Sequence, residues 1–205
     1  MSEIKIVYID DNIDDVVSKY LKTVYCTENY LENSNEYVKK YVEVIFDENL
    51  NYESLLNDTR IRSANVLLID NKLYESRSAG SGRLTGRQFK ILLRRFFPFI
   101  ETLIITQDET LIGENIVHKF SGTNISKSDA YYTENLGKKI DISIKEVLEY
   151  EKLSKELDNN TDVDTLLIEK VRLSLRGDDS YNELSKADVD NLIESFKELK
   201  DKIDL

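Results

Sequence analysis

The chain has 205 residues, a hydrophobic content of 40% and a formal net charge of −11. This length is enough for one full domain with a sizeable core and a small appendage. Binding to nucleic-acid backbones or anionic membranes depends on neutralising phosphates with Lys and Arg. The acidic balance therefore argues against both, and neither a DNA partner nor a membrane contact is expected.

Three features of the sequence favour a cytoplasmic protein, and the first of them indicates a reducing compartment. Cys26 is the single cysteine, so no internal disulfide can form. No run approaches the ~18 consecutive apolar residues that span a bilayer. The first residues, MSEIKIVYIDD, lack the basic start and apolar stretch of a secretory signal. A cytoplasmic protein is expected.

Short apolar runs rich in β-branched residues predict buried strands. Between them, apolar residues recur at helical spacing over 16–24, 55–61 and 89–96, and the last of these helices must end near Pro98. The predicted strands are residues 4–9, 41–46, 66–69, 102–105 and 116–120. Such alternation is typical of an α/β fold whose parallel strands are joined by crossover helices.

Polar residues stand at or just past the ends of four of these strands. The carboxyl ends of parallel strands share one edge of the sheet, where ligands bind in open α/β folds. Residues far apart in sequence are therefore expected to meet there. They are Asp10, Asp11, Asp70, Thr106 and Lys119.

The rest of the chain is predicted to be loop or helix. Residues 71–85 are polar and contain two glycines, which indicates a long loop. Helices are expected over 140–157, 162–176 and 186–203, and the last has an apolar stripe. We expect a domain over residues 1–150 and a helical extension over 151–205. The stripe consists of Val189, Leu192, Ile193, Phe196, Leu199 and Ile203.

Three carboxylates at one sheet edge repel one another unless a cation neutralises them. Mg²⁺ suits a set of oxygen ligands that leaves room for a phosphate oxygen. A phosphoryl group arriving at Asp70 would also meet the Lys119 ammonium and the Thr106 hydroxyl. Phosphoryl transfer depends mainly on positioning and electrostatic stabilisation, which these groups would supply.

In these residues the chain resembles the response-regulator receiver family, of the CheY-like superfamily. That family has an acidic pair after its first strand, an acceptor aspartate after the third, Ser or Thr after the fourth and Lys after the fifth. Here IVYIDD, VLLID, LIIT and VHKF match in order. Gly86 in LTGRQFKILLRR matches the glycine that opens the family's third helix. The resemblance covers residues 3–150.

The resemblance implies a flavodoxin-like fold, a doubly wound sheet of five parallel strands. It implies a signalling protein rather than an enzyme, phosphorylated on Asp70 by a histidine kinase or another phosphodonor. Asp10 and Asp11 would hold Mg²⁺ together with Asp70 and the backbone carbonyl of Lys72. Thr106 and Lys119 would contact the phosphoryl oxygens. The output would pass through contacts with a protein partner that the sequence does not identify.

Several positions depart from the family's pattern. Lys72 stands where an apolar residue is common, and Gln107 where a small one is usual. Only 13 positions separate Thr106 from Lys119, so the fourth helix must be short or missing. Ile116 replaces a frequent aromatic residue and Phe120 a common proline. These departures leave the site chemistry intact and put the family's output mechanism in question.

The sequence is also compatible with two other functions. One is a receiver-like scaffold or adaptor subunit that works without phosphorylation, which the shortened fourth connection and the long loop favour. The other is a Mg²⁺-dependent phosphohydrolase with an aspartyl nucleophile. Such enzymes usually have two aspartates two positions apart after the first strand, whereas Asp10 and Asp11 are adjacent. The scaffold is therefore the stronger alternative.

Two surfaces have open interpretations. The basic residues Arg83, Arg87, Arg94 and Arg95 are interpreted as a solvated helix face. The alternative is a docking surface for an acidic partner. The apolar stripe near the C-terminus is expected to pack on its own protein. The alternative for that stripe is contact with a partner helix or with a second copy in a homodimer.

Overall fold

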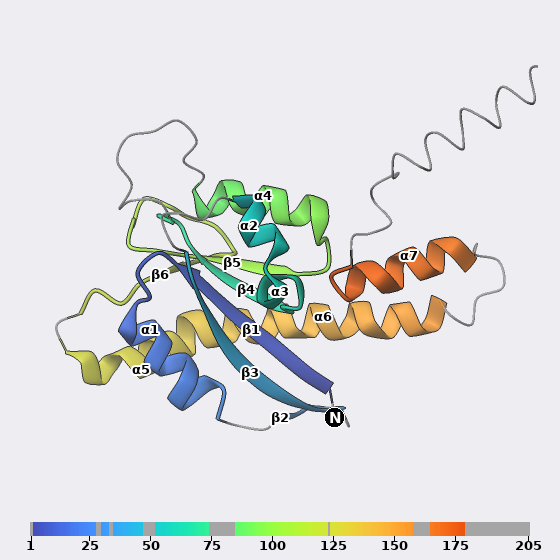
Figure 1. The fold of residues 1–205 in the computed structure, drawn as a ribbon. Coiled ribbons are helices and arrows are strands. Elements are labelled where there is room, and N and C mark those ends of the chain that lie inside the picture. Colours follow the sequence, from blue (N-terminus) through green and yellow to red (C-terminus); the bar gives the residue numbers. More distant parts are fainter. Residues whose placement is uncertain are drawn as a thin grey trace, which may run out of the picture.

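The structure, a computed structural model, describes residues 2–27, 30–32, 35–46, 52–73, 85–122, 124–157 and 165–178. A twisted sheet in the order β2-β3-β1-β4-β5-β6 forms its centre (Figure 1). The strands are β1 (Ser2–Asp10), β2 (Tyr30–Glu32), β3 (Asn35–Ile45), β4 (Val66–Asp70), β5 (Glu101–Thr106) and β6 (Ile116–His118).

Five of these strands, from β3 to β6, pair in parallel, which confirms the predicted sheet. The chain order of the parallel strands, second-first-third-fourth-fifth, is that of the flavodoxin-like doubly wound fold. The short strand β2 pairs antiparallel with β3 and was not predicted. The fold class is therefore α/β, as expected, with helices on both faces of the sheet.

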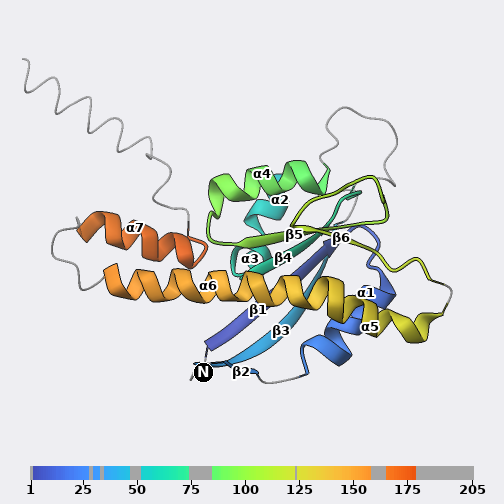
Figure 2. The same cartoon turned by 180° about the vertical axis from the view of Figure 1, so that it is seen from behind.

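Helices on the two faces bury two separate cores. α1 (Asp15–Tyr20), α5 (Ser128–Tyr132) and α6 (Lys138–Leu157) lie on one face, and α2 (Tyr52–Asn57), α3 (Thr59–Arg62) and α4 (Gly86–Phe96) on the other (Figure 2). The residues of strand β1 divide between these two cores. Ile6 and Tyr8 belong to the first core, whereas Val7 and Ile9 belong to the second. Alternate residues of a strand point to opposite faces, so both faces of β1 must be apolar.

Some boundaries differ from the sequence-based ones. Strand β3 begins at Asn35 and not at residue 41, where the sequence predicted it. The prediction was wrong because the buried Lys39 interrupts the apolar pattern of the strand with a charge. Its ammonium lies 3.9 Å from Asp141 Oδ1 and 3.9 Å from the centre of the Tyr25 ring. A buried charge needs such partners, and α6 supplies one of them. The α1 helix continues in a π-helical turn, Leu21–Tyr25.

The C-terminal part is helical where the structure describes it. A 3₁₀ turn (Ile125–Lys127), α5, a π-helical turn (Thr133–Gly137) and α6 follow one another directly. Helix α6 runs unbroken through residue 150, where the boundary between domain and extension was expected. α7 (Thr165–Leu175) packs against α6. The predicted helix over 186–203 lies outside the described residues.

Helix α7 ends where it meets α3. Gly177 has a φ of +71°, and a Cβ atom there would lie 1.9 Å from the carbonyl oxygen of Arg62. The Arg62 side chain in turn donates a hydrogen bond to the Gly177 carbonyl, with an N–O distance of 3.1 Å. Glycine is thus required by the backbone and by the close contact. Within the described ranges, no helix is long and apolar enough to cross a bilayer.

Candidate functional site: the carboxyl edge of the sheet

The carboxyl ends of β1 and β4 bring two predicted aspartates to one lysine. The Lys119 ammonium lies 2.8 Å from Asp70 Oδ1 and 3.1 Å from Asp10 Oδ2. Asp10 and Asp70 are almost completely buried, and the Lys119 side chain is 10% exposed. Because little water reaches them, these charges interact more strongly than charges on the surface. Three residues from distant parts of the sequence therefore form one buried ionic cluster.

Two groups of its own strand and turn hold Asp10. The Tyr8 hydroxyl donates a hydrogen bond to Asp10 Oδ2, and the Asn12 backbone N–H donates one to Oδ1 at 3.0 Å. The sequence interpretation missed Tyr8. The pattern contains the necessary information, since residues two apart in a strand point to the same face. Tyr8 thus orients Asp10 from within the core.

Asp70 is placed by the start of the following loop and by helix α4. The Lys72 backbone N–H donates a hydrogen bond to Asp70 Oδ2 at 2.6 Å, and the Gly86 N–H donates one to the Asn71 carbonyl at 3.0 Å. A Cβ atom on Gly86 would lie 2.4 Å from the Asp70 carbonyl oxygen. The predicted role of Gly86 in opening the helix is confirmed. Thr85 caps this helix in a capping box with Gln88.

Thr106 ends β5 and is tied to Lys119 through the backbone. The Lys119 N–H donates a hydrogen bond to the Thr106 carbonyl at 2.7 Å. The buried Thr106 hydroxyl accepts one from the Asp108 N–H at 3.0 Å. A shift of the Lys119 backbone would therefore displace the end of β5 through the hydrogen bond to the Thr106 carbonyl.

A cavity of about 240 Å³ opens above the ionic cluster. Asp11, the second residue of the predicted acidic pair, reaches this cavity although it is only half-buried. Thr106 is not among the described residues that line it. The lining residues are Asp10, Asp11, Asn12, Asp70, Lys72, Gln107 and Lys119.

Burial and like charge make the two carboxylates costly to ionise. Burial raises the pKa of Asp10, and burial together with the nearby Asp10 charge raises the pKa of Asp70. Burial alone would lower the pKa of Lys119, but the hydrogen bond and charge of Asp70, followed by those of Asp10, raise it. One ammonium thus faces two carboxylates that remain incompletely neutralised.

Charge and donor chemistry at this cavity fit a divalent cation, although the arrangement is not that of a closed metal site. No group of three or more Asp, Glu, His or Cys side chains in the described part of the chain is arranged to hold a metal. Lys119 lies between Asp10 and Asp70. The oxygen atoms of Asp10, Asp11 and Asp70 are nonetheless the kind that Mg²⁺ prefers.

The connection between β5 and β6 differs from an ordinary crossover. Residues 107–115 contain no helix, which confirms the expectation that this helix is short or missing. Phe120 follows Lys119 with its ring 5.5 Å from that of Tyr131, and its backbone N–H donates to the Tyr132 hydroxyl at 2.9 Å. The end of β6 is thus anchored to α5.

Comparison with known proteins finds distant structural likenesses. No protein-family model and no curated protein matches the sequence. A two-component transcriptional regulator AraC from Clostridium phytofermentans ISDg has a TM-score of 0.43 and 13% identity, covering 73% of this chain and 98% of its own. RcsB from Salmonella enterica serovar Typhimurium, bound to promoter rprA with BeF₃⁻, has a TM-score of 0.37 and 18% identity, covering 68% and 67%. These proteins are described as regulators. The likenesses are too distant to assign a family, and the fold is established by the order of the strands.

The expectation that no DNA is bound has to be corrected. Several of the similar structures are described as RcsB bound to DNA. The exclusion was wrong because it applied the net charge of the whole chain to a question that local surfaces decide. An acidic chain can still present a basic face, as Arg87, Lys90 and Arg94 do on α4.

Proposed function

We propose that this chain is a signalling receiver in which Asp70 accepts a phosphoryl group from a histidine kinase or a small phosphodonor. The observation that carries the proposal is the buried cluster of Asp70, Asp10 and Lys119 beneath a cavity at the carboxyl edge of the sheet. A carboxylate placed directly beside a fixed ammonium suits phosphoryl transfer, because the ammonium stabilises the charge of the incoming group.

In the proposed reaction, an Asp70 carboxylate oxygen forms a bond to phosphorus. The bond from phosphorus to the donor's leaving atom breaks, and the leaving group takes the electron pair and then a proton. Lys119 would pair with an oxygen of the arriving group, and the Thr106 hydroxyl would exchange its contact with the Asp108 N–H for another. Asp10, Asp11 and Asp70, with the backbone carbonyl of Lys72, would hold Mg²⁺, which neutralises charge during transfer.

The test is acetyl phosphate treatment with Mg²⁺, followed by separation on a phosphate-binding gel and intact-mass measurement. The native chain should gain one phosphoryl group, and Asp70→Asn should gain none. Asp15→Asn is the matched control, since Asp15 is exposed on α1 and caps no site residue. A phosphoryl group on Asp70→Asn, or none on the native chain at saturating donor, would refute the proposal.

A second candidate is a receiver-like adaptor that works without phosphorylation. The helix-free connection over 107–115 favours it, because the usual path from acceptor to output would pass through that region. If it is correct, Asp70→Asn retains the biological activity of the native chain. If the receiver is correct, the same substitution abolishes signalling. Both candidates act through a protein partner, and a homodimer is compatible with either.

A further inference from the structure

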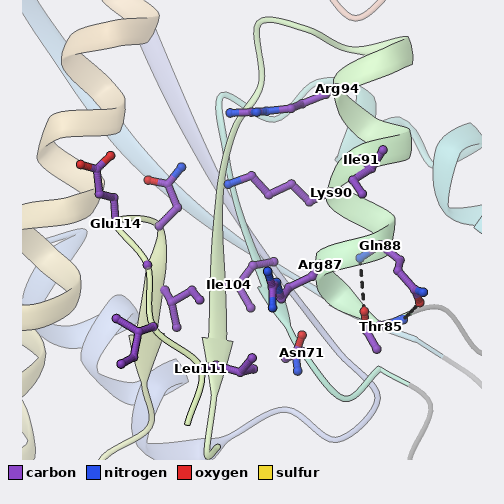
Figure 3. Close-up of a pocket in the computed structure, with 14 residues that line it drawn as sticks. Asn71, Thr85, Arg87, Gln88, Lys90, Ile91, Arg94, Ile104, Leu111 and Glu114 are labelled. Carbon is purple, nitrogen blue, oxygen red and sulfur yellow. Dashed lines mark hydrogen bonds between the residues drawn. The ribbon is translucent and has the colours of Figure 1, made fainter. Parts of the chain in front are cut away.

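An open groove lies on the opposite side of β5 from the helix α6 face. It runs between α4 and the connection that leads into β6, and its volume is about 720 Å³ (Figure 3). Ile104 of β5 lies in its lining, and Leu111 and Glu114 line it on the side away from α4. The missing helix between β5 and β6 accounts for the groove, because nothing in the segment 107–115 covers this part of the sheet.

Large apolar side chains on both walls of the groove are exposed. Ile91 on α4 is 69% exposed, and Ile112 on the opposite wall is 87% exposed. Single exposed apolar residues are ordinary, but two on facing walls above an apolar floor indicate a surface that binds another chain segment. Burying both would remove apolar area from water and so favour docking.

A basic rim accompanies these residues. Arg87, Lys90 and Arg94 are spaced by three and four positions, so they share one face of α4. They extend from the helix toward β5 in Figure 3. Lys90 donates a hydrogen bond to the Thr102 carbonyl at 2.8 Å, while Arg87 and Arg94 are exposed. The groove therefore suits an occupant that is apolar on one side and acidic beside it.

The described chain ends next to this groove. Asp178, its last described residue, lines a smaller hollow together with Arg94 and Arg95. Arg94 also lines the large groove. The 27 residues that follow Asp178 thus start at the Arg94 end of α4.

The sequence beyond Asp178 has the matching chemistry. Residues 186–203 contain the apolar stripe at helical spacing. Residues 179–194 contain one basic residue, Lys186, and five acidic ones. The acidic residues are Asp179, Glu183, Asp188, Asp190 and Glu194. The acidic half of the segment comes first, and it is the half that leaves the structure beside Arg94.

We propose that residues 186–203 of the same chain dock in this groove as an amphipathic helix, with the stripe against Ile91 and Ile112. The segment would take the place of the missing helix. The lengths permit it. Eight residues from Asp178 can span up to ~28 Å, whereas the 11 residues of α4 extend over about 16 Å. The proposal is independent of phosphoryl transfer at Asp70.

The first experiment measures amide hydrogen exchange by mass spectrometry on the full-length chain. Ile112→Asp puts a charge on the groove wall, and the peptides of 186–203 should then exchange at least about tenfold faster. Ile112 is so exposed that the fold should tolerate the change. The control is Ile142→Asp on α6, also exposed at 60%, which should leave 186–203 unchanged. Equal exchange of 186–203 in the native chain and Ile112→Asp would overturn the proposal.

The second experiment changes the docking segment and measures exchange in the groove. Phe196→Asp disrupts the apolar stripe, and exchange over 87–94 and 109–116 should accelerate, whereas Lys197→Asp, off the stripe, should not change it. The protection must be independent of protein concentration, because the contact is intramolecular. Protection that appears only at high concentration would indicate a second copy, and protection that appears only with added duplex DNA would indicate DNA. Either result would overturn the proposal.

Discussion

Two regions of the same sheet differ in which side chains they expose to solvent. At the ends of β1 and β4, Asp10 and Asp70 are 2% and 5% exposed, and each carboxylate has at least two partners. Along the β5–β6 side, Ile91 and Ile112 remain open to solvent. Buried charge has to be compensated inside the domain, because water cannot do it. Exposed apolar side chains, in contrast, can remain in contact with water until another chain segment covers them. The cluster of Asp10, Asp70 and Lys119 therefore finds its main partners within the domain, whereas the described residues leave the apolar walls of the groove open to solvent.

Removing the Lys119 ammonium, which both carboxylates share, should destabilise the carboxyl edge of the sheet most severely. Lys119→Met leaves Asp10 and Asp70 buried and facing each other without compensation. We expect the free energy of unfolding at pH 7 in Mg²⁺-free buffer to fall by about 3 kcal/mol. Urea denaturation followed by circular dichroism measures it. The loss should shrink when Asp10→Asn and Asp70→Asn are also present. An undiminished loss in that background would assign the effect to packing instead.

Gly86→Ala tests the contact between α4 and β4, the strand that ends in Asp70. The new Cβ would lie 2.4 Å from the Asp70 carbonyl oxygen and 3.0 Å from Ile69 Cγ2, so the helix start must move. Overpacking of this kind should outweigh the better helix propensity of Ala and reduce thermal stability by about 2 kcal/mol. The control is Gly113→Ala beside the groove, whose Cβ would meet the flexible Ile116 side chain at 3.3 Å. A shift in melting temperature as large for Gly113→Ala as for Gly86→Ala would contradict the contact.

Asp70→Asn should have the smallest effect on stability, and its sign depends on pH. The pKa of Asp70 is raised in the folded state, so its contribution to stability is greatest below the unfolded pKa and is lost as pH rises through the folded pKa. Asn stays neutral. The variant should therefore gain about 1 kcal/mol relative to the native chain between pH 4 and pH 7.

The control for that titration is Asp58→Asn. The hydrogen bond from Arg60 lowers the pKa of Asp58, so its stabilising contribution is present above the unfolded pKa and is lost as pH falls through the folded pKa. Between pH 4 and pH 7 this variant should therefore be less stable than the native chain by a nearly constant amount, and the difference should shrink only below pH 4. Urea midpoints measure the pH profiles of both variants. Parallel pH profiles for the two variants would show that burial of Asp70 does not control its ionisation.

The clustering of polar residues at the carboxyl edge could be predicted because the order of strands in a parallel sheet determines which strand ends lie together. Asp10, Asp70 and Thr106 each follow an apolar run, and a parallel sheet places those ends together. Lys119 could be added in the same way. The contact of Tyr8 with Asp10 was also available from the two-residue period of the strand, but a tyrosine in an apolar run is more readily interpreted as core.

Other parts depended on contacts that no local pattern records. The first half of β3 was missed because Lys39 is compensated by Asp141, about 100 positions later in the chain. The groove could be anticipated only as a missing helix. Its shape depends on how far α4 stands from the segment 111–116, which follows from packing of the whole second core.

The hydrogen bond between the Gly86 N–H and the Asn71 carbonyl has a consequence for tolerance to insertion. It joins Asn71, the residue after Asp70, to Gly86, the first residue of α4, so the two ends of the 14 intervening positions are held together. Lengthening a loop whose ends are already fixed costs little, about 0.6 kcal/mol for each doubling. Extra sequence inserted between Asn71 and Gly86 should therefore be tolerated while the sheet keeps its register.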